Sequence, residues 1–182
     1  LGTTPIHAHK LEAGTWILQL QHPDCDPTTF AVEVERDTHA ALTPPGRAEP
    51  IALPLPARGS LGDELVYVPP GWFRAGGRHA PQPIPPARLW LDGFLVERHL
   101  TTLADWLAFA RALHQQGSPA RLWTLPRHVA PGPDGAPAVL GSQEPTCPVA
   151  HVLAEPLQAY LSWRSQRDGR AWRLMHELEY EK

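Results

Sequence analysis

Cysteine and long apolar runs are scarce in this sequence, and their scarcity excludes several classes of protein. The two cysteines, Cys25 and Cys147, lie in unlike sequence contexts, so no disulfide framework or zinc cluster is expected. Cysteine usage therefore does not indicate whether the protein works in an oxidising or a reducing compartment. No stretch approaches the ~20 apolar residues of a membrane-spanning helix. The net charge of -3 argues against nucleic acid or an anionic membrane surface as the main partner.

Proline is the residue in excess. The chain has 22 Pro and 14 Gly in 182 residues, which excludes a mostly helical protein because proline is barred from helix interiors. Hydrophobic residues make up 42% of the chain and seven residues are tryptophan, which indicates a folded core. At ~100–200 residues per domain, the length allows one domain or two small ones.

Both ends of the sequence are expected to be internal to a longer chain. The first residue is Leu1, and residues 179–182 stop within a helical pattern without a Gly, Asn or Pro stop signal. The lack of a leader sequence therefore carries no weight.

The first part of the chain is predicted to be a small all-β domain over residues 1–45. Apolar residues alternate with polar ones over 15–20 and 30–35, the period of half-buried strands. Residues 22–27 have the Pro and Asp of a turn, so the two runs predict a hairpin. The Pro-rich residues 46–62 predict a linker, although residues 51–53 could instead form a last strand.

The second part, residues 63–182, combines strands and helices. Strands are predicted over 64–68, 72–75 and 88–97, the last with a break at 92–93. A helix follows Thr102, whose side chain can cap it together with Asp105.

A Pro- and Gly-rich insert over 118–148 separates the helix after Thr102 from the later elements. A second helix is expected to begin near Pro156, and a third near His176. Leu178 and Tyr180 of the third helix are expected to pack against the two longer helices. These two helices should keep an apolar face partly uncovered.

Residues 64–182 resemble the domain shared by formylglycine-generating enzymes and sulfatase-modifying factors. The matching pieces follow the family's order, at 65–77, 91–109, 147–149 with 158–163, and 167–182. The resemblance implies an α+β fold related to C-type lectins, with the C-terminal half of that domain beyond residue 182. It also implies the family's activity, oxidation of a target-protein cysteine to formylglycine.

The sequence departs from that family at several positions. Leu153 and Ala154 stand where the family usually has Ser or Asp followed by Trp, and Met175 and His176 replace its Pro-Thr. The resemblance places the copper-binding cysteines, and most calcium ligands, beyond Lys182. We therefore assign no catalytic, cofactor-binding or metal-binding residue within this segment, and we expect no cofactor in it.

Residues 1–6 followed by 13–16 resemble the PEGA-type β-domain of bacterial surface and signalling proteins. The pairing of such a domain with the second part resembles bacterial serine/threonine kinases that carry a formylglycine-generating-enzyme-like domain. It implies a kinase domain before residue 1, because no kinase motif occurs within the sequence.

Several residues invite a functional interpretation that the sequence does not support. His176 and Glu177 would suit a metalloprotease helix, but the second histidine of that motif is replaced by Tyr180. His7 and His9 are better read as solvated residues than as metal ligands, and Cys147 as an inert thiol. The remaining residues are assigned to structure: Trp106, Trp163 and Trp172 to the core, Glu177, Glu179 and Glu181 to a helix N-terminus, and Arg173 to a pair with one of these glutamates.

Three functions remain open on this basis. The first is a binding, accessory or sensor module of a bacterial signalling protein. The second is a metal-dependent oxidase whose catalytic part lies beyond residue 182, and the third is a structural spacer. Fold alone does not choose among them, and neither ligand, oligomeric state nor compartment follows from the sequence, although a cytoplasmic location is favoured.

Overall fold

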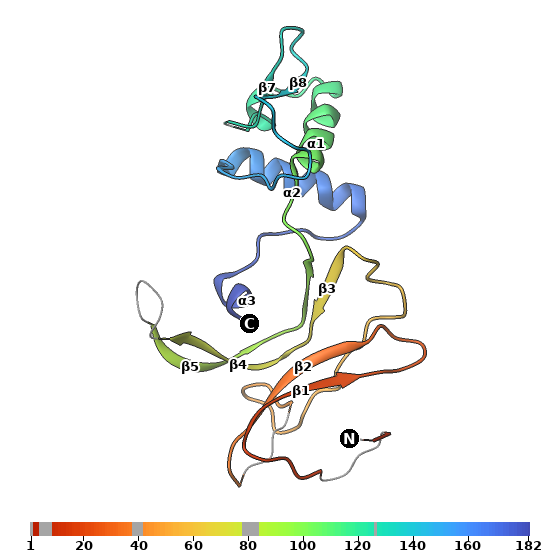
Figure 1. Cartoon of the computed structure of the whole chain (residues 1–182), viewed down its shortest axis with the longest axis vertical. Coiled ribbons are helices and arrows are strands. Elements are labelled where there is room, and N and C mark those ends of the chain that lie inside the picture. The colour runs from red at the N-terminus through yellow and green to blue at the C-terminus, as the bar shows by residue number, and fades with distance from the viewer. Residues whose placement is uncertain (1, 4–8, 38–41, 78–83, 126) are drawn as a thin grey trace. The chain divides into compact units, whose positions relative to one another are not determined.

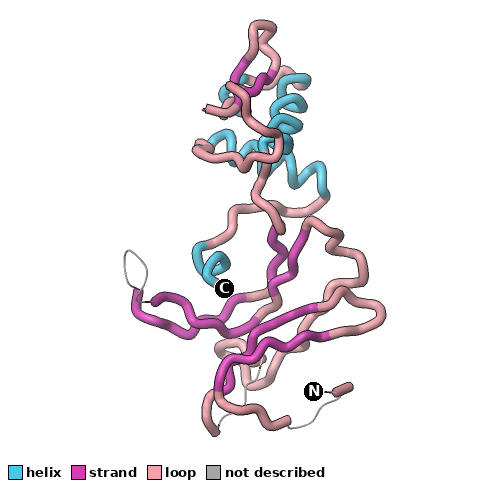
Figure 2. Tube along the Cα trace, in the orientation of Figure 1, coloured by secondary structure: helices cyan, strands magenta, loops and turns pink. Residues whose placement is uncertain are grey.

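Most of the strands and the two long helices belong to different parts of the chain. The computed structural model describes residues 2–3, 9–37, 42–77, 84–125 and 127–182. It divides into a strand unit, Leu1–Arg98 with Met175–Lys182, and a helical unit, His99–Leu174. Figure 2 shows strands filling the first unit and the two long helices in the second, which confirms the α+β class. No helix in the described ranges is long and apolar enough to cross a membrane.

The predicted N-terminal hairpin is confirmed. Strand β1 (Gly14–Leu20) pairs antiparallel with β2 (Thr28–Val34), with Trp16 opposite Val32 and Leu18 opposite Phe30 (Figure 1). An isolated two-stranded hairpin is marginal in water, so this one needs support from the rest of its unit.

Part of that support comes from the segment interpreted as a linker. Residues 46–62 contain no helix or strand, so the strand considered for 51–53 does not form. Ala57 nevertheless forms a β-bridge with Cys25, and the amide of Asp26 donates to the Pro56 carbonyl at 2.9 Å. The Arg58 side chain donates to the carbonyl oxygens of His22 and Pro23. The end of this segment is therefore fastened to the hairpin turn.

Four further strands form one interrupted ribbon. Strand β3 (Leu65–Val68) pairs with β6 (Phe94–Glu97), and β4 (Gly71–Gly77) pairs with β5 (Ile84–Leu91). Val68 lies opposite Phe94 and Gly71 opposite Leu91, so both ladders share one register. Pro69 and Pro70 interrupt them because proline has no amide hydrogen to donate. The predicted strands and the break at 92–93 are confirmed, and β5 begins four residues earlier than expected.

Gly93 allows the ribbon to pass this interruption. A Cβ at Gly93 would lie 2.9 Å from Cδ of Pro70 and 3.0 Å from the Tyr67 hydroxyl oxygen. The backbone can approach the prolines this closely only because glycine has no side chain.

We expect Gly93→Ala to destabilise the strand unit by about 1–3 kcal/mol, the usual cost of forcing an extra methyl into a packed site. Urea unfolding would measure the change. Gly77→Ala is the matched control, because a Cβ there meets nothing within 4 Å. Equal losses in the two variants would contradict the steric account.

The C-terminal helix α3 (Glu177–Glu181) belongs to the strand unit, where it contacts β4. The amide of Gly76 donates to Glu181 Oε2 at 3.0 Å. Lys182 Nζ donates to the Pro69 carbonyl at 2.7 Å and lies 3.4 Å from the carbonyl oxygens of Gly71 and Leu91. The expectation that this helix packs on the two longer helices is wrong. A helix this short holds through tertiary contacts, and β4 supplies them, while Tyr180 stays 81% exposed.

Burial lowers the pKa of Lys182 from 10.5 to about 8, an effect that Asp92 partly offsets. The unfolded chain therefore holds this proton more tightly, and between pH 8 and 10.5 the contribution of Lys182 to stability rises with pH. We expect Lys182→Met to lose this rise and the control Lys10→Met to keep it, as measured by urea unfolding across the window. A Lys182→Met profile parallel to that of the wild type would contradict this account.

The helical unit contains α1 (Leu103–Gln115), the 3-10 helix η1 (Ala120–Leu122), the hairpin β7 (Val129–Pro131) and β8 (Pro137–Val139), and α2 (Ala154–Asp168). The predicted cap of the first helix is confirmed: the amide of Asp105 donates to the Thr102 hydroxyl and the amide of Thr102 donates to the Asp105 carboxylate. Helix α2 begins two residues before Pro156 and ends at Gly169, whose φ of 63° is left-handed.

The core of this unit covers the apolar face of α1. Trp106 stacks on Tyr160 of α2 with ring centroids 5.2 Å apart, and its indole nitrogen donates to the Trp123 carbonyl at 2.9 Å. The buried residues are Leu103, Trp106, Phe109, Ala110, Leu113, Trp123, Leu125, Val129 and Tyr160. The expectation that α1 keeps this face partly uncovered is therefore wrong, because the insert over 118–148 supplies three of these residues.

Candidate functional site

A groove of about 1240 Å³ lies beside the N-terminal hairpin within the strand unit. Its apolar lining includes Leu18, Leu20, Phe30, Leu42, Ile51 and Leu53. Charged residues of both signs also line it, among them Lys10, Glu12, Glu33 and Arg88. An apolar concave surface with a few polar groups is the usual form of a ligand site.

The groove meets the two strands of the hairpin in different ways. From β1 it takes only Leu18 and Leu20, which share one face, whereas from β2 it takes every residue over 30–34. Successive side chains of a strand point to opposite faces. The groove therefore lies against the face that carries Leu18 and Phe30, and it extends further along β2 than along β1.

Trp72 of β4 and Arg88 of β5 form the opposite wall. The Trp72 indole nitrogen donates to the Thr43 carbonyl at 2.9 Å, and its ring meets Trp90 edge-on at 5.7 Å between centroids. The Arg88 guanidinium carbon lies 5.0 Å from the Trp72 ring centroid, within reach of a cation–π interaction. This wall of the groove thus presents the Arg88 cation lying on the aromatic face of Trp72.

Charge is distributed unevenly along this wall. Arg74 lies directly opposite Arg88 in the ladder, an arrangement of like charges that is unfavourable in itself. Arg74 is compensated by Glu33 at 2.6 Å and Glu35 at 3.9 Å. The hydrogen bond from Arg74 lowers the pKa of Glu33, with smaller contributions from the charges of Arg74 and Arg88 and with burial opposing the shift. Arg88 forms no ion pair with any residue that the structure describes, although its charge also acts on Glu33.

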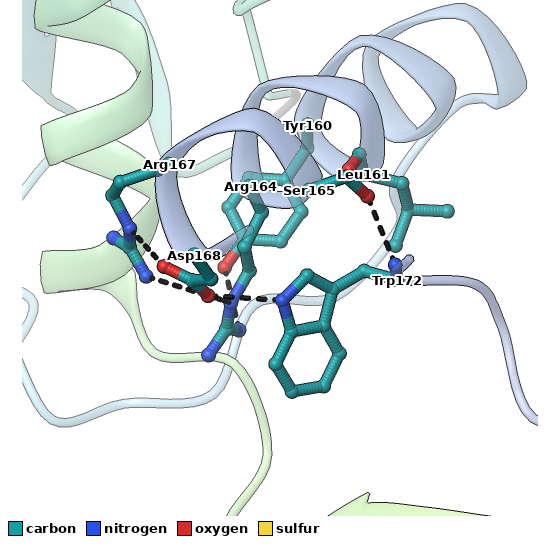
Figure 3. A network of polar contacts seen from close by, with 7 residues as sticks. All are labelled: Tyr160, Leu161, Arg164, Ser165, Arg167, Asp168 and Trp172. Carbon is teal, nitrogen blue, oxygen red and sulfur yellow. Dashed lines mark hydrogen bonds and ion pairs between the residues drawn. The ribbon is translucent and has the colours of Figure 1, made fainter. Parts of the chain in front are cut away.

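A second cluster of polar groups lies at the C-terminal end of α2 (Figure 3). Asp168 accepts hydrogen bonds from Arg167 Nε at 2.6 Å, Trp172 Nε1 at 2.9 Å and Arg164 Nε at 3.3 Å. The Arg164 guanidinium lies 4.5 Å from the Trp172 ring centroid, and the Ser165 hydroxyl accepts from the Trp172 amide at 2.9 Å. These groups satisfy one another, so the cluster fastens the turn after α2 and presents no evident ligand site.

We expect Asp168→Asn to destabilise the helical unit by about 1–3 kcal/mol, because it weakens hydrogen bonds to donors that stay half-buried. The hydrogen bond from Arg167, above all, lowers the pKa of Asp168 below 3.8. The difference in unfolding free energy between the wild type and Asp168→Asn is therefore fully present above pH 3.8. It disappears as the pH falls through the lowered pKa of Asp168.

Thermal unfolding at several pH values measures this effect. Glu155→Gln is the control in the same helix, since its ion pair with Arg121 is exposed and such pairs contribute little. A pH-independent difference between Asp168→Asn and the wild type would contradict the linkage.

The residues singled out from the sequence are scattered. Trp106 lies in the core at 1% exposure, which confirms its structural assignment, and Trp172 belongs to the Asp168 cluster. Glu179 accepts from the His176 amide at 2.8 Å, as expected for a helix start. Arg173 donates to the Leu174 carbonyl, and its predicted pairing with a glutamate stays a prediction.

The described histidine and cysteine residues among those singled out are distributed over both units. His7 lies outside the described residues, while His9 lines the groove. Cys25 is half-buried in the strand unit and Cys147 in the helical unit. Within the described ranges, no group of three or more His, Cys, Asp or Glu residues is arranged to hold a metal ion.

Sequence reasoning missed the groove, because its walls come from the hairpin, the segment read as a linker and the β4–β5 ribbon. One signal was present: Trp72 with Arg74, and Arg88 with Trp90, each share a strand face at a spacing of two.

Comparison with known families gives one match. A model described as the sulfatase-modifying factor enzyme 1-like domain matches residues 52–182, more than half of the chain. The matched region includes Trp72 and Arg88, while the hairpin that forms the other side of the groove precedes it. No curated protein matches the sequence.

Proposed function

Since the chain belongs to the family of sulfatase-modifying factor enzyme 1-like domains, we propose that it is a binding or accessory module of that family. The groove along β2 is its ligand site. The observation that carries the proposal is Arg88, a cation without a described ion-pair partner that lies on Trp72 in a largely apolar groove. Such an arrangement supplies both apolar contact and a directing charge.

The wider context of this module is also a proposal. The resemblance of residues 1–45 to a PEGA-type β-domain supports a sensor role in a bacterial signalling protein, with a kinase domain upstream. The sequence of the parent gene on both sides of this segment tests that context. An upstream reading frame without kinase motifs would exclude the kinase linkage.

The family match supports a second candidate, a metal-dependent oxidase that generates formylglycine. A copper(I) centre takes soft thiolate ligands, and the residues that the structure describes include no group of three or more His, Cys, Asp or Glu residues that could hold a metal ion. We derive no oxidation step from this chain. We propose that the copper and calcium sites of an enzymatic relative correspond to positions beyond residue 182.

Binding of the apolar fluorescent probe anilinonaphthalene sulfonate tests the groove directly. We expect Val32→Trp to weaken probe binding several-fold, because the larger side chain fills the groove. Ile17→Trp is the matched control on the same hairpin, where Ile17 is 73% exposed and does not line the groove. Circular dichroism checks that both variants fold.

Equal probe binding by the two variants would contradict a ligand site in the groove. Conversion of a cysteine peptide to the aldehyde by the copper-supplied chain would favour the oxidase instead. Mass spectrometry of the peptide distinguishes the two candidates.

A further inference from the structure

We propose that the groove binds an extended peptide, which adds as a third strand to the free edge of β2 and directs an acidic side chain toward Arg88. This inference rests on the proposed function, because it names the ligand of the same groove. Three independent features of the described residues lead to it: an open strand edge, a cation without an ion-pair partner among those residues, and the size of the groove.

The open edge supplies the backbone recognition. Among the described strands, β2 pairs only with β1. In an antiparallel pair, alternate backbone groups of each strand point away from the partner, so on β2 these groups form a second edge on the side away from β1. Unpaired amide and carbonyl groups of an edge strand are a template for another strand. Strand addition is a recurring mode of peptide binding in which these backbone groups provide the affinity.

Side chains along the groove supply selectivity. An added strand would present alternate residues to the apolar lining around Leu18 and Phe30. Glu33 is already engaged by Arg74 at 2.6 Å, so a basic residue of the peptide would compete with an existing pair. Arg88 has no such partner among the described residues. Next to Arg88, charge complementarity therefore favours a carboxylate on the peptide, whereas Glu12, Glu35 and Asp37 elsewhere in the lining disfavour further acidic residues.

The size of the groove favours a peptide over a small molecule. Its volume of about 1240 Å³ exceeds the ~300–1,000 Å³ of ordinary small-molecule pockets. The β2 strand beside it has seven residues, enough to pair with a peptide of similar length. A small amphiphile with an anionic head is the competing occupant, and it needs no backbone hydrogen bonds.

Fluorescence anisotropy with a defined probe tests the proposal. The probe is a labelled eight-residue peptide of alternating valine and threonine with one central glutamate. A second peptide has the same sequence with alternate backbone amides methylated, which removes the donors of one edge. We expect methylation to weaken binding more than about tenfold, since each net hydrogen bond contributes ~0.5–1.5 kcal/mol.

The role of Arg88 is tested by removing its charge and then by reversing it. We expect Arg88→Gln to weaken binding of the glutamate peptide by roughly 2- to 5-fold, the range for a partly exposed ion pair. Arg47→Gln, a substitution outside the groove lining, should leave binding unchanged. A peptide with lysine in place of the central glutamate should bind Arg88→Glu better than the wild type.

Each result decides a separate part of the proposal. Equal binding of the methylated and unmethylated peptides would overturn strand addition and favour the amphiphile. The absence of a charge-reversal effect would overturn the role of Arg88. Failure of the peptide to bind, while the naphthalene probe still binds the groove, would overturn this inference but leave the proposed function standing.

Discussion

The register shared by the two ladders of the β3–β6 and β4–β5 ribbon is the constraint on which the groove depends. It places Trp72 and Arg88 as diagonal neighbours on one face of the ribbon. A slip of one residue in β4 would send its side chains to the opposite face of the ribbon. The stacked Trp72–Arg88 pair and the bond between Arg74 and Glu33 would then be lost together.

Three residues shape the interruption in the ribbon. Pro69 and Pro70 remove two amide donors from the ladder, and Gly93 lets the opposing backbone approach them. The ammonium group of Lys182 then donates to the Pro69 carbonyl, close to those of Gly71 and Leu91. This contact joins helix α3 to the strands. The carbonyl groups around the interrupted ladder therefore bind a segment that lies about a hundred residues further along the chain.

Local patterns in the sequence predicted the elements whose stability is local. The cap at Thr102, the alternation over 15–20 and 30–35, and the break at 92–93 each depend on neighbouring residues, and each is confirmed. Residues 118–148 lack a period, so the burial of Leu125 and Val129 could not be predicted from them.

Features that depend on residues far apart in the sequence were mostly not predicted, apart from the family resemblance. The resemblance of residues 64–182 to a known family is confirmed by the match over 52–182. The packing of α3 on β4 was missed, because it depends on contacts across about a hundred residues. The groove was missed for the same reason, and the PEGA-like assignment and the domain boundary near 46–62 stay predictions.

Residue-resolved amide hydrogen exchange along β2 tests the central claim most directly, because it reports whether the strand edge is free. Pairing with β1 alone should protect alternate amides over 28–34. The account predicts slow and fast exchange in alternation without ligand, and slowing of the fast set when the glutamate peptide is added. Uniform protection of all these amides in the free chain would contradict the account, because another strand would already occupy the edge.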